Sequence, residues 1–283
     1  MQQFRMRSVS TLFALVIALA VCTPGIGFAQ DGKPQPVDVE LVLAVDVSWS
    51  MDADEQRLQR DGYAAAFRDP LIIQAIVEGG WGAISVTYFE WAGTQYHRMI
   101  VPWTVIKNAQ TARAFADKLV REPIGRLRRT SISGAMVAAR DLFKRNPFKG
   151  LRRVIDISGD GANNEGFPVE PVRDILVNEG TTINGLPIMI KRGGPGSFFS
   201  IANLDEYYRD CVIGGTGAFF IPVTDKRRFT AAIRRKLLLE IAGRQPRIIF
   251  AQSKPPGPRA DCLIGEKRWR EWQERGENYF MVP

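Results

Sequence analysis

Residues 41–50 have the sequence LVLAVDVSWS, and this stretch decides the fold that we expect for the chain. Its first five residues are apolar and predict a strand that is buried on both faces of a parallel sheet. Asp46 follows, and Ser48 and Ser50 come after it at alternate positions. Ligands of open α/β sheets bind at the carboxyl ends of strands, where this spacing lets a turning chain direct three oxygens to one point. Hard oxygen ligands suit Mg²⁺ or Mn²⁺, so we predict a divalent-cation site here.

Strand-like and helix-like segments alternate along the rest of the chain. Residues 96–103 resemble a hairpin partner or an edge strand, and Asp69-Pro70 interrupts the first helical stretch. The alternation predicts a doubly wound, mostly parallel α/β sheet flanked by helices. The expected strands after the first are residues 83–91, 96–103, 153–158, 181–190 and 218–223, and the expected helices are residues 52–78, 108–121, 131–143, 171–179, 204–211 and 229–241.

The first thirty residues are expected to lie outside the folded domain. Arg5 and Arg7 precede an apolar run at residues 12–21, and Gly27-Phe28-Ala29 provides a small-x-small end. This pattern predicts a secretory signal peptide at residues 1–29 that is cleaved near Ala29, because the apolar run is shorter than the ~20 residues of a membrane span. We therefore expect a periplasmic or secreted protein. Its domain occupies residues 38–243, and a basic extension with Pro and Trp residues occupies 244–283.

Two cysteines remain once the leader with Cys22 is removed. Cys211 and Cys262 predict one disulfide in an oxidising compartment, and two independent buried thiols are the alternative. The bond would join the end of the chain to the main domain. With His97 as the only histidine, we expect no zinc site.

The positive charge of the chain is concentrated at its end. Residues 226–283 carry a net charge of +8, and residues 30–225 carry about −2. A solvated helix face explains such a basic tail, and contact with an anionic membrane surface or with nucleic acid is the alternative. We expect no nucleic-acid partner.

Two further oxygen donors lie where the predicted fold would bring them to the first motif. Thr130 precedes a helix, and Asp160 follows the fourth strand, which neighbours the first strand across the switch point of a doubly wound sheet. This set of Asp-x-Ser-x-Ser, Thr and Asp resembles the metal-ion-dependent adhesion site of von Willebrand factor A domains, and the similarity covers residues 38–243. Residues 129–135 and 157–164 are also similar to a bacterial family of exported proteins of unknown function that share this fold.

The resemblance implies roles for the five residues. Ser48, Ser50 and Thr130 would bind the cation through hydroxyls, and Asp46 and Asp160 would hold its coordinated waters. An open position on Mg²⁺ (or Mn²⁺) would then accept a carboxylate from a protein partner. The alternative is that the three hydroxyls cap helices and Asp160 closes a turn.

The sequence departs from the family pattern at two places. Gly159 stands where a Thr precedes the Asp-Gly pair in many members, and Trp49 puts a bulky aromatic inside the first motif, where it could narrow the access of a partner. Asn163 and Asn164 could contact a ligand or form a turn. Asp156 and Glu90 lie within buried strands, and we favour a structural role for both.

A binding module and an enzyme are the two classes of function that we consider. The enzyme would be a Mg²⁺-dependent, phosphatase-like hydrolase with Asp46 as the nucleophile. Haloacid dehalogenase-type phosphotransferases have a second Asp two residues later, where this chain has Ser48. No glycine-rich phosphate loop follows the first strand, and a single histidine makes a Ser-His-Asp triad untenable. We therefore predict the binding module.

Overall fold

The computed structural model describes residues 33–190, 201–243 and 259–280. The expected leader and most of the connector after residue 243 lie outside the described residues. The chain divides into two compact units, Met1–Lys33 and Pro34–Pro283, and every element described below belongs to the second unit.

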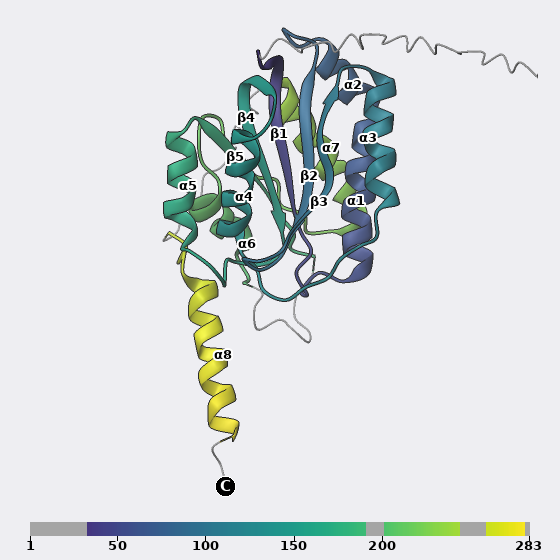
Figure 1. Cartoon of the computed structure of the whole chain (residues 1–283). Helices are drawn as coiled ribbons and strands as arrows, with labels where there is room; N and C mark the ends of the chain where they lie inside the picture. The colour runs from purple at the N-terminus through teal and green to yellow at the C-terminus, as the bar shows by residue number, and fades with distance from the viewer. Residues whose placement is uncertain (1–32, 191–200, 244–258, 281–283) are drawn as a thin grey trace, which may run out of the picture. The chain divides into compact units, whose positions relative to one another are not determined.

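A five-stranded sheet in the order β3-β2-β1-β4-β5 forms the centre of this unit (Figure 1). β1 pairs in parallel with β2 on one side and with β4 on the other, and β4 pairs in parallel with β5. β3 is antiparallel to β2 and lies at the edge, as residues 96–103 predicted. The predicted neighbourhood of the first and fourth strands is confirmed. The strands are β1 Gln35–Asp46, β2 Ile84–Trp91, β3 His97–Ile106, β4 Phe148–Gly159 and β5 Thr181–Pro187.

Helices cover both faces of the sheet (Figure 1). Successive side chains of a strand point to opposite faces, so Leu41 and Leu43 pack in one core while Val42 and Ala44 pack in the other. The first core is shared with α1 Ala53–Arg68, α2 Pro70–Val77, α3 Ala109–Arg121 and α7 Phe229–Ala242. The second is shared with α4 Ile132–Lys144, α5 Val169–Asn178, α6 Leu204–Tyr207 and the π-helical turn Tyr208–Val212 that continues α6. The doubly wound α/β fold is therefore present.

Short polar signals set the helix starts. Asp52 accepts a hydrogen bond from the Glu55 backbone N–H at 2.8 Å, and the Glu55 side chain accepts one from the Asp52 N–H at 3.0 Å. This capping box begins α1 at the end of the chain segment that carries Ser48 and Ser50. Asp69 caps α2, whose first residue is Pro70. Ser131 caps α4, with its Oγ accepting from the Gly134 N–H at 3.1 Å.

One expected element differs from the structure. Residues 218–223 were expected to form the last strand, but they contact β5 only through isolated bridges at Phe220 and Val223. Pro187 lacks the N–H donor that a continuous parallel ladder with these residues needs. The basic extension expected at residues 244–283 contains a long helix, α8 Ile264–Phe280, which has strong helix formers and no proline. None of the helices within the described residues is long and apolar enough to span a membrane.

Candidate metal centre

The first motif forms a turn immediately after β1. The Ser48 backbone N–H donates a hydrogen bond to Asp46 Oδ1 at 2.7 Å, which bends the chain back over its own carboxylate. The hydroxyls of Ser48 and Ser50 then lie 3.0 Å apart. Asp46 and Ser48 are buried, whereas Ser50 is half-buried at the mouth of the turn. The three oxygens of Asp-x-Ser-x-Ser are thus directed to one place.

Asp160 joins this cluster from the end of β4. Ser50 Oγ donates a hydrogen bond to Asp160 Oδ1 at 2.5 Å, so a single hydroxyl bridges the two loops. The preceding residue is Gly159, and a Cβ there would lie 2.8 Å from Asp46 Oδ2 and 3.2 Å from the Tyr208 hydroxyl oxygen. The departure from Thr at this position therefore has a steric reason: the Asp46 carboxylate occupies the space that a side chain would need.

Thr130 approaches the same loop from the start of α4. Its Oγ1 lies 3.6 Å from the position that a Cβ on Gly161 would take. Two hydrogen bonds hold its backbone there, because the Thr130 N–H donates to Asn164 Oδ1 and the Asn164 N–H donates to the Thr130 carbonyl, both at 2.9 Å. Within the described residues the Thr130 hydroxyl itself makes no hydrogen bond that the structure records.

The alternative interpretation, in which the three hydroxyls cap helices, is wrong. α1 is capped by Asp52 and α4 by Ser131, so none of the hydroxyls of Ser48, Ser50 and Thr130 serves as a side-chain cap. The side-chain oxygens of Asp46, Ser48, Ser50 and Asp160 instead gather at the ends of β1 and β4, and Thr130 lies beside Gly161, the residue after Asp160. A cap explains none of these three hydroxyls.

The electrostatics of the cluster favour a cation. Asp46 is 0% exposed, its Oδ2 accepts no hydrogen bond from any described residue, and no described Lys or Arg pairs with it. Burial raises the pKa of Asp46 well above its usual value, and the nearby Asp160 carboxylate raises it further. A buried carboxylate oxygen beside a second carboxylate and two hydroxyls has the composition of a hard-cation site. The donor set therefore fits Mg²⁺ or Mn²⁺.

Sequence reasoning left the roles of Asn163 and Asn164 open, and it did not identify Tyr207 or Glu266 at all. Asn163 Oδ1 accepts from the Ser133 N–H at 3.1 Å, Asn163 Nδ2 donates to Glu266 Oε1 at 2.7 Å, and its N–H donates to the Tyr207 hydroxyl at 3.2 Å. Asn163 thereby connects the loop after Asp160 to α4, α6 and α8. Consecutive asparagines after the Asp-Gly pair were the only signal of this role.

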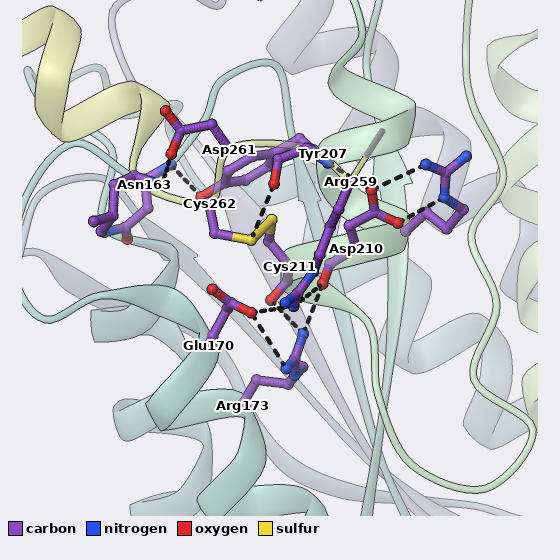
Figure 2. The surroundings of a disulfide bond; sticks show 12 residues. Asn163, Glu170, Arg173, Tyr207, Asp210, Cys211, Arg259, Asp261 and Cys262 are labelled. Atoms are coloured by element: carbon purple, nitrogen blue, oxygen red, sulfur yellow. Dashed lines mark hydrogen bonds and ion pairs between the residues drawn. A yellow bond between two sulfur atoms is a disulfide. The ribbon is translucent and has the colours of Figure 1, made fainter. Parts of the chain in front are cut away.

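The predicted disulfide is present between Cys211 and Cys262, whose Cα atoms lie 5.5 Å apart (Figure 2). It joins the π-helical turn after α6 to the residue that precedes the start of α8 by two positions. Cys211 follows Tyr207 closely, and Glu266 follows Cys262 closely, so the bond helps to fix two of the partners of Asn163. The disulfide therefore supports the loop that carries Asp160.

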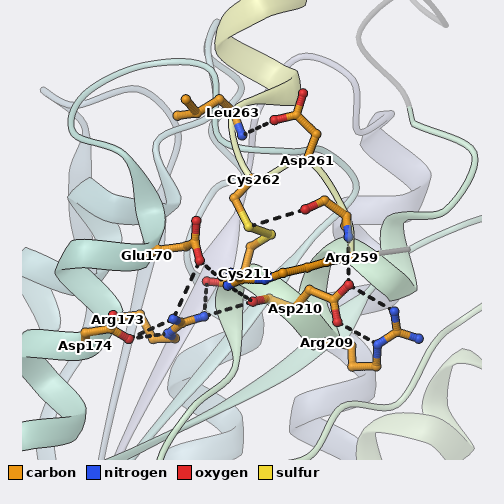
Figure 3. A network of polar contacts seen from close by, with 11 residues as sticks. Glu170, Arg173, Asp174, Arg209, Asp210, Cys211, Arg259, Asp261, Cys262 and Leu263 are labelled. Carbon is orange, nitrogen blue, oxygen red and sulfur yellow. Dashed lines mark hydrogen bonds and ion pairs between the residues drawn. A yellow bond between two sulfur atoms is a disulfide. The ribbon is translucent and has the colours of Figure 1, made fainter. Parts of the chain in front are cut away.

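Charged residues surround the disulfide (Figure 3). Asp210 accepts from the Ala260 N–H at 2.8 Å and pairs with Arg209 at 2.7 Å, and the pKa of its carboxyl is lowered by the Arg209 hydrogen bond. Arg173 donates to the carbonyls of Asp210 and Cys211 at 3.0 and 3.1 Å. These contacts hold residues 259–262 against α5 and the π-helical turn.

The two other buried acids are structural, as favoured from the sequence. Asp156 Oδ1 pairs with Lys236 Nζ at 2.7 Å, and Asp156 Oδ2 accepts from the Tyr63 hydroxyl at 3.0 Å. Glu90 pairs with Arg60, and both side chains are buried. Within the described residues no group of three or more His, Cys, Asp or Glu side chains could hold a metal ion.

Residues 36–245 match the model of a family described as a protein of unknown function, DUF1194. The chain belongs to this family. No functionally curated protein has a sequence that matches it.

Solved structures share the fold. The chain is similar to the pilus adhesin SpaC from Lactobacillus rhamnosus GG (12% identity, TM-score 0.54, covering 74% of this chain and 31% of the adhesin). It is also similar to proximal thread matrix protein 1 from the mussel byssus (13% identity, TM-score 0.52, covering 74% of this chain and 49% of that protein). A third is the vWF domain of the type V pili tip protein Mfa5 from Porphyromonas gingivalis (10% identity, TM-score 0.50, covering 78% and 98%). The chain thus spans half or less of the first two proteins and has a von Willebrand factor A-like fold.

Proposed function

We propose that this chain is an exported binding module that recognises a protein partner through a divalent cation, Mg²⁺ or Mn²⁺, held by Asp46, Ser48, Ser50, Thr130 and Asp160. One observation carries the proposal: Asp46 Oδ2 is buried without a hydrogen bond from any described residue, beside hydroxyls that cap no helix. Leaving a buried charged group without a partner costs free energy. A cation from solution would remove that cost.

The five residues would share the work unequally. The hydroxyls of Ser48, Ser50 and Thr130 would be neutral ligands, whereas Asp46 and Asp160 would hold coordinated waters. A cation with neutral direct ligands remains electron-poor and supplies a site for a carboxylate from a partner. Asn164 and Gly159 would position the ligand loops, because the first holds the Thr130 backbone and the second leaves room for Asp46.

Different observations support the export of the protein and its adhesive role. The pattern of residues 1–29 predicts a secretory leader, and these residues lie outside the described part of the chain. The disulfide is consistent with an oxidising compartment. Two of the proteins that share the fold are a pilus adhesin and a pilus tip protein, which supports an adhesive role for this chain as well.

Thermal unfolding of the exported, chelator-treated protein tests the cation. We expect Mg²⁺ or Mn²⁺ to raise the melting temperature, because a ligand at 100 times its Kd adds about 2.7 kcal/mol to the free energy of unfolding. Asp46→Ala and Thr130→Ala should abolish the rise. Asp54→Ala is the matched control, since Asp54 is exposed at the start of α1 and should leave the rise intact.

If neither Mg²⁺ nor Mn²⁺ changes the melting temperature of the wild-type protein, the proposal is contradicted. Hydrolysis of a generic phosphoester that needs Mg²⁺ and Asp46 would replace it with the enzyme alternative.

A further inference from the structure

Two arginines next to the candidate metal centre stack on the aromatic side chain inside its first motif. Trp49 lies between Ser48 and Ser50 and is 52% exposed. The guanidinium carbon of Arg128 lies 4.6 Å from the centre of the Trp49 ring, and that of Arg126 lies 5.5 Å from it. Both distances are within the range of cation–π contacts. We name this exposed group, Trp49 with Arg126 and Arg128, the arginine platform.

The platform is built beside the ligand serines. Leu127, between the two arginines, forms a parallel bridge with Ser48, and its N–H donates to the Val47 carbonyl at 3.2 Å. Arg126 also donates a hydrogen bond to the Trp49 carbonyl at 2.6 Å. The strand-like segment that carries the arginines therefore runs alongside the motif that carries the serines, and Thr130 follows two residues after Arg128.

Buried contacts fix the segment at both ends. The buried Arg60, paired with Glu90, donates to the carbonyls of Glu122 and Pro123, which precede the platform. The Thr130–Asn164 hydrogen bonds hold the other end. The backbone of the segment that carries the two arginines is thus fixed before a partner binds, which lowers the entropy cost of binding.

The charges of the platform are available for a partner. Both arginines are exposed, and among the described residues no carboxylate forms an ion pair with either of them. Stacking on Trp49 leaves the N–H donors of Arg128, and those of Arg126 that do not bond to the Trp49 carbonyl, open for a planar carboxylate. The contrast is Arg98, a neighbour of the same loop, which is already paired with Glu122 at 2.8 Å.

We propose that the arginine platform is a second docking subsite and that the partner is an acidic peptide segment, with one carboxylate directed to the cation and at least one more to Arg126 or Arg128. The inference rests on the proposed function for its first contact, and the platform adds the second. Two carboxylates on one backbone would satisfy both sites, whereas a single carboxylate would satisfy only one. The platform therefore selects for clustered Asp and Glu residues in the partner.

Fluorescence anisotropy with two labelled probes tests this in Mg²⁺. One probe is hexaglutamate, and the other has the same length with one glutamate and five glutamines. We expect the wild-type protein to bind hexaglutamate about tenfold more tightly, because it offers charge-assisted pairs to the platform. The variant Arg126→Gln/Arg128→Gln should lose that advantage. The control Arg113→Gln/Arg235→Gln removes the same charge from exposed positions on α3 and α7 and should keep it.

Each outcome separates the platform from the cation. Equal Mg²⁺-dependent affinity for both probes, or an advantage that survives in Arg126→Gln/Arg128→Gln, overturns the platform and leaves the cation function standing. If each probe binds with the same affinity in Mg²⁺ and in chelator, an arginine-dependent preference for hexaglutamate supports the platform and overturns the proposed function. Loss of the advantage in the control as well, or arginine-dependent binding to phosphatidylglycerol vesicles without preference for hexaglutamate, overturns the platform as an acidic-peptide site.

Discussion

Two neighbouring strands each carry a fully buried aspartate, and the two carboxylates have opposite surroundings. Asp156, inside β4, pairs with Lys236 from α7 and accepts from Tyr63, and Lys236 also pairs with Glu240. Asp46, at the end of β1, has the Ser48 N–H on one oxygen and no partner among the described residues on the other. The fold therefore neutralises one buried acid with its own lysine and gives the other no positive counter-charge from the described residues. A buried carboxylate has a structural role when a side chain of the protein supplies its counter-charge, and a functional role when a ligand supplies it.

The largest effect on this comparison is expected when the buried positive charge of Lys236 is removed. Lys236→Met should lower the free energy of unfolding by about 3 to 5 kcal/mol, because it leaves Asp156 and Glu240 buried together without a positive charge. Denaturant unfolding measures the loss. Arg235→Met on the exposed side of the same helix is the control, and adding Asp156→Asn to Lys236→Met should recover part of the stability. A Lys236→Met protein as stable as the control would show that the core network does not need its lysine.

The pH dependence of the core network sharpens the comparison. Burial raises the pKa of Glu240 to about 7, against the lowering effect of Lys236. A folded-state pKa above the unfolded value contributes stability that is complete below about pH 4.5 and is lost as pH rises through 7. Glu240→Gln keeps an oxygen for Asn184 and Lys236 but cannot titrate. We expect the stability of the wild type relative to Glu240→Gln to fall by about 1 to 3 kcal/mol between pH 4.5 and 8. Parallel stability curves for the two proteins would contradict the assignment.

The smallest expected change in the free energy of unfolding is at the candidate metal centre, where the sign of the change is informative. In chelator, Asp46→Asn should leave the free energy of unfolding unchanged or raise it by about 1 kcal/mol, because it removes a buried charge that lacks a counter-charge. The isosteric Asp156→Asn should instead destabilise, since it breaks the contact with Lys236. Paired unfolding curves at one pH provide the measurement. Equal destabilisation by both substitutions would mean that Asp46 has an internal partner after all.

Local sequence patterns predicted much of the fold. Residues 41–45 predicted β1, and the helix expected from residue 52 begins as α1, because hydrophobic period and capping depend on residues close in the chain. The failure at residues 218–223 has the same origin. Their apolar character suggested a strand, but whether a ladder forms depends on a distant partner, and Pro187 of β5 has no N–H to donate to these residues.

The candidate site shows the same division. Given a doubly wound sheet, the order Asp46, Ser48, Ser50, Thr130, Asp160 predicted one cluster of oxygen donors, and the hydrogen bonds from Ser50 to Ser48 and to Asp160 join the two loops that carry four of them. Asn163 supports these side chains through hydrogen bonds to Tyr207 and Glu266. These two partners come from helices far along the chain, so they form no motif with a recognisable spacing. The arginine platform was visible only as a basic loop beside a motif with an unusual tryptophan.

By itself, the sequence determined the alternation of strands and helices, the cysteine pair and the five oxygen donors, since each depends on residue type and on near neighbours. Only the tertiary structure decided that Lys236 compensates Asp156 while nothing in the described chain compensates Asp46, and that Arg126 and Arg128 stack on Trp49. Charge compensation depends on distances in space between segments remote in sequence, and it is settled only when the chain has folded.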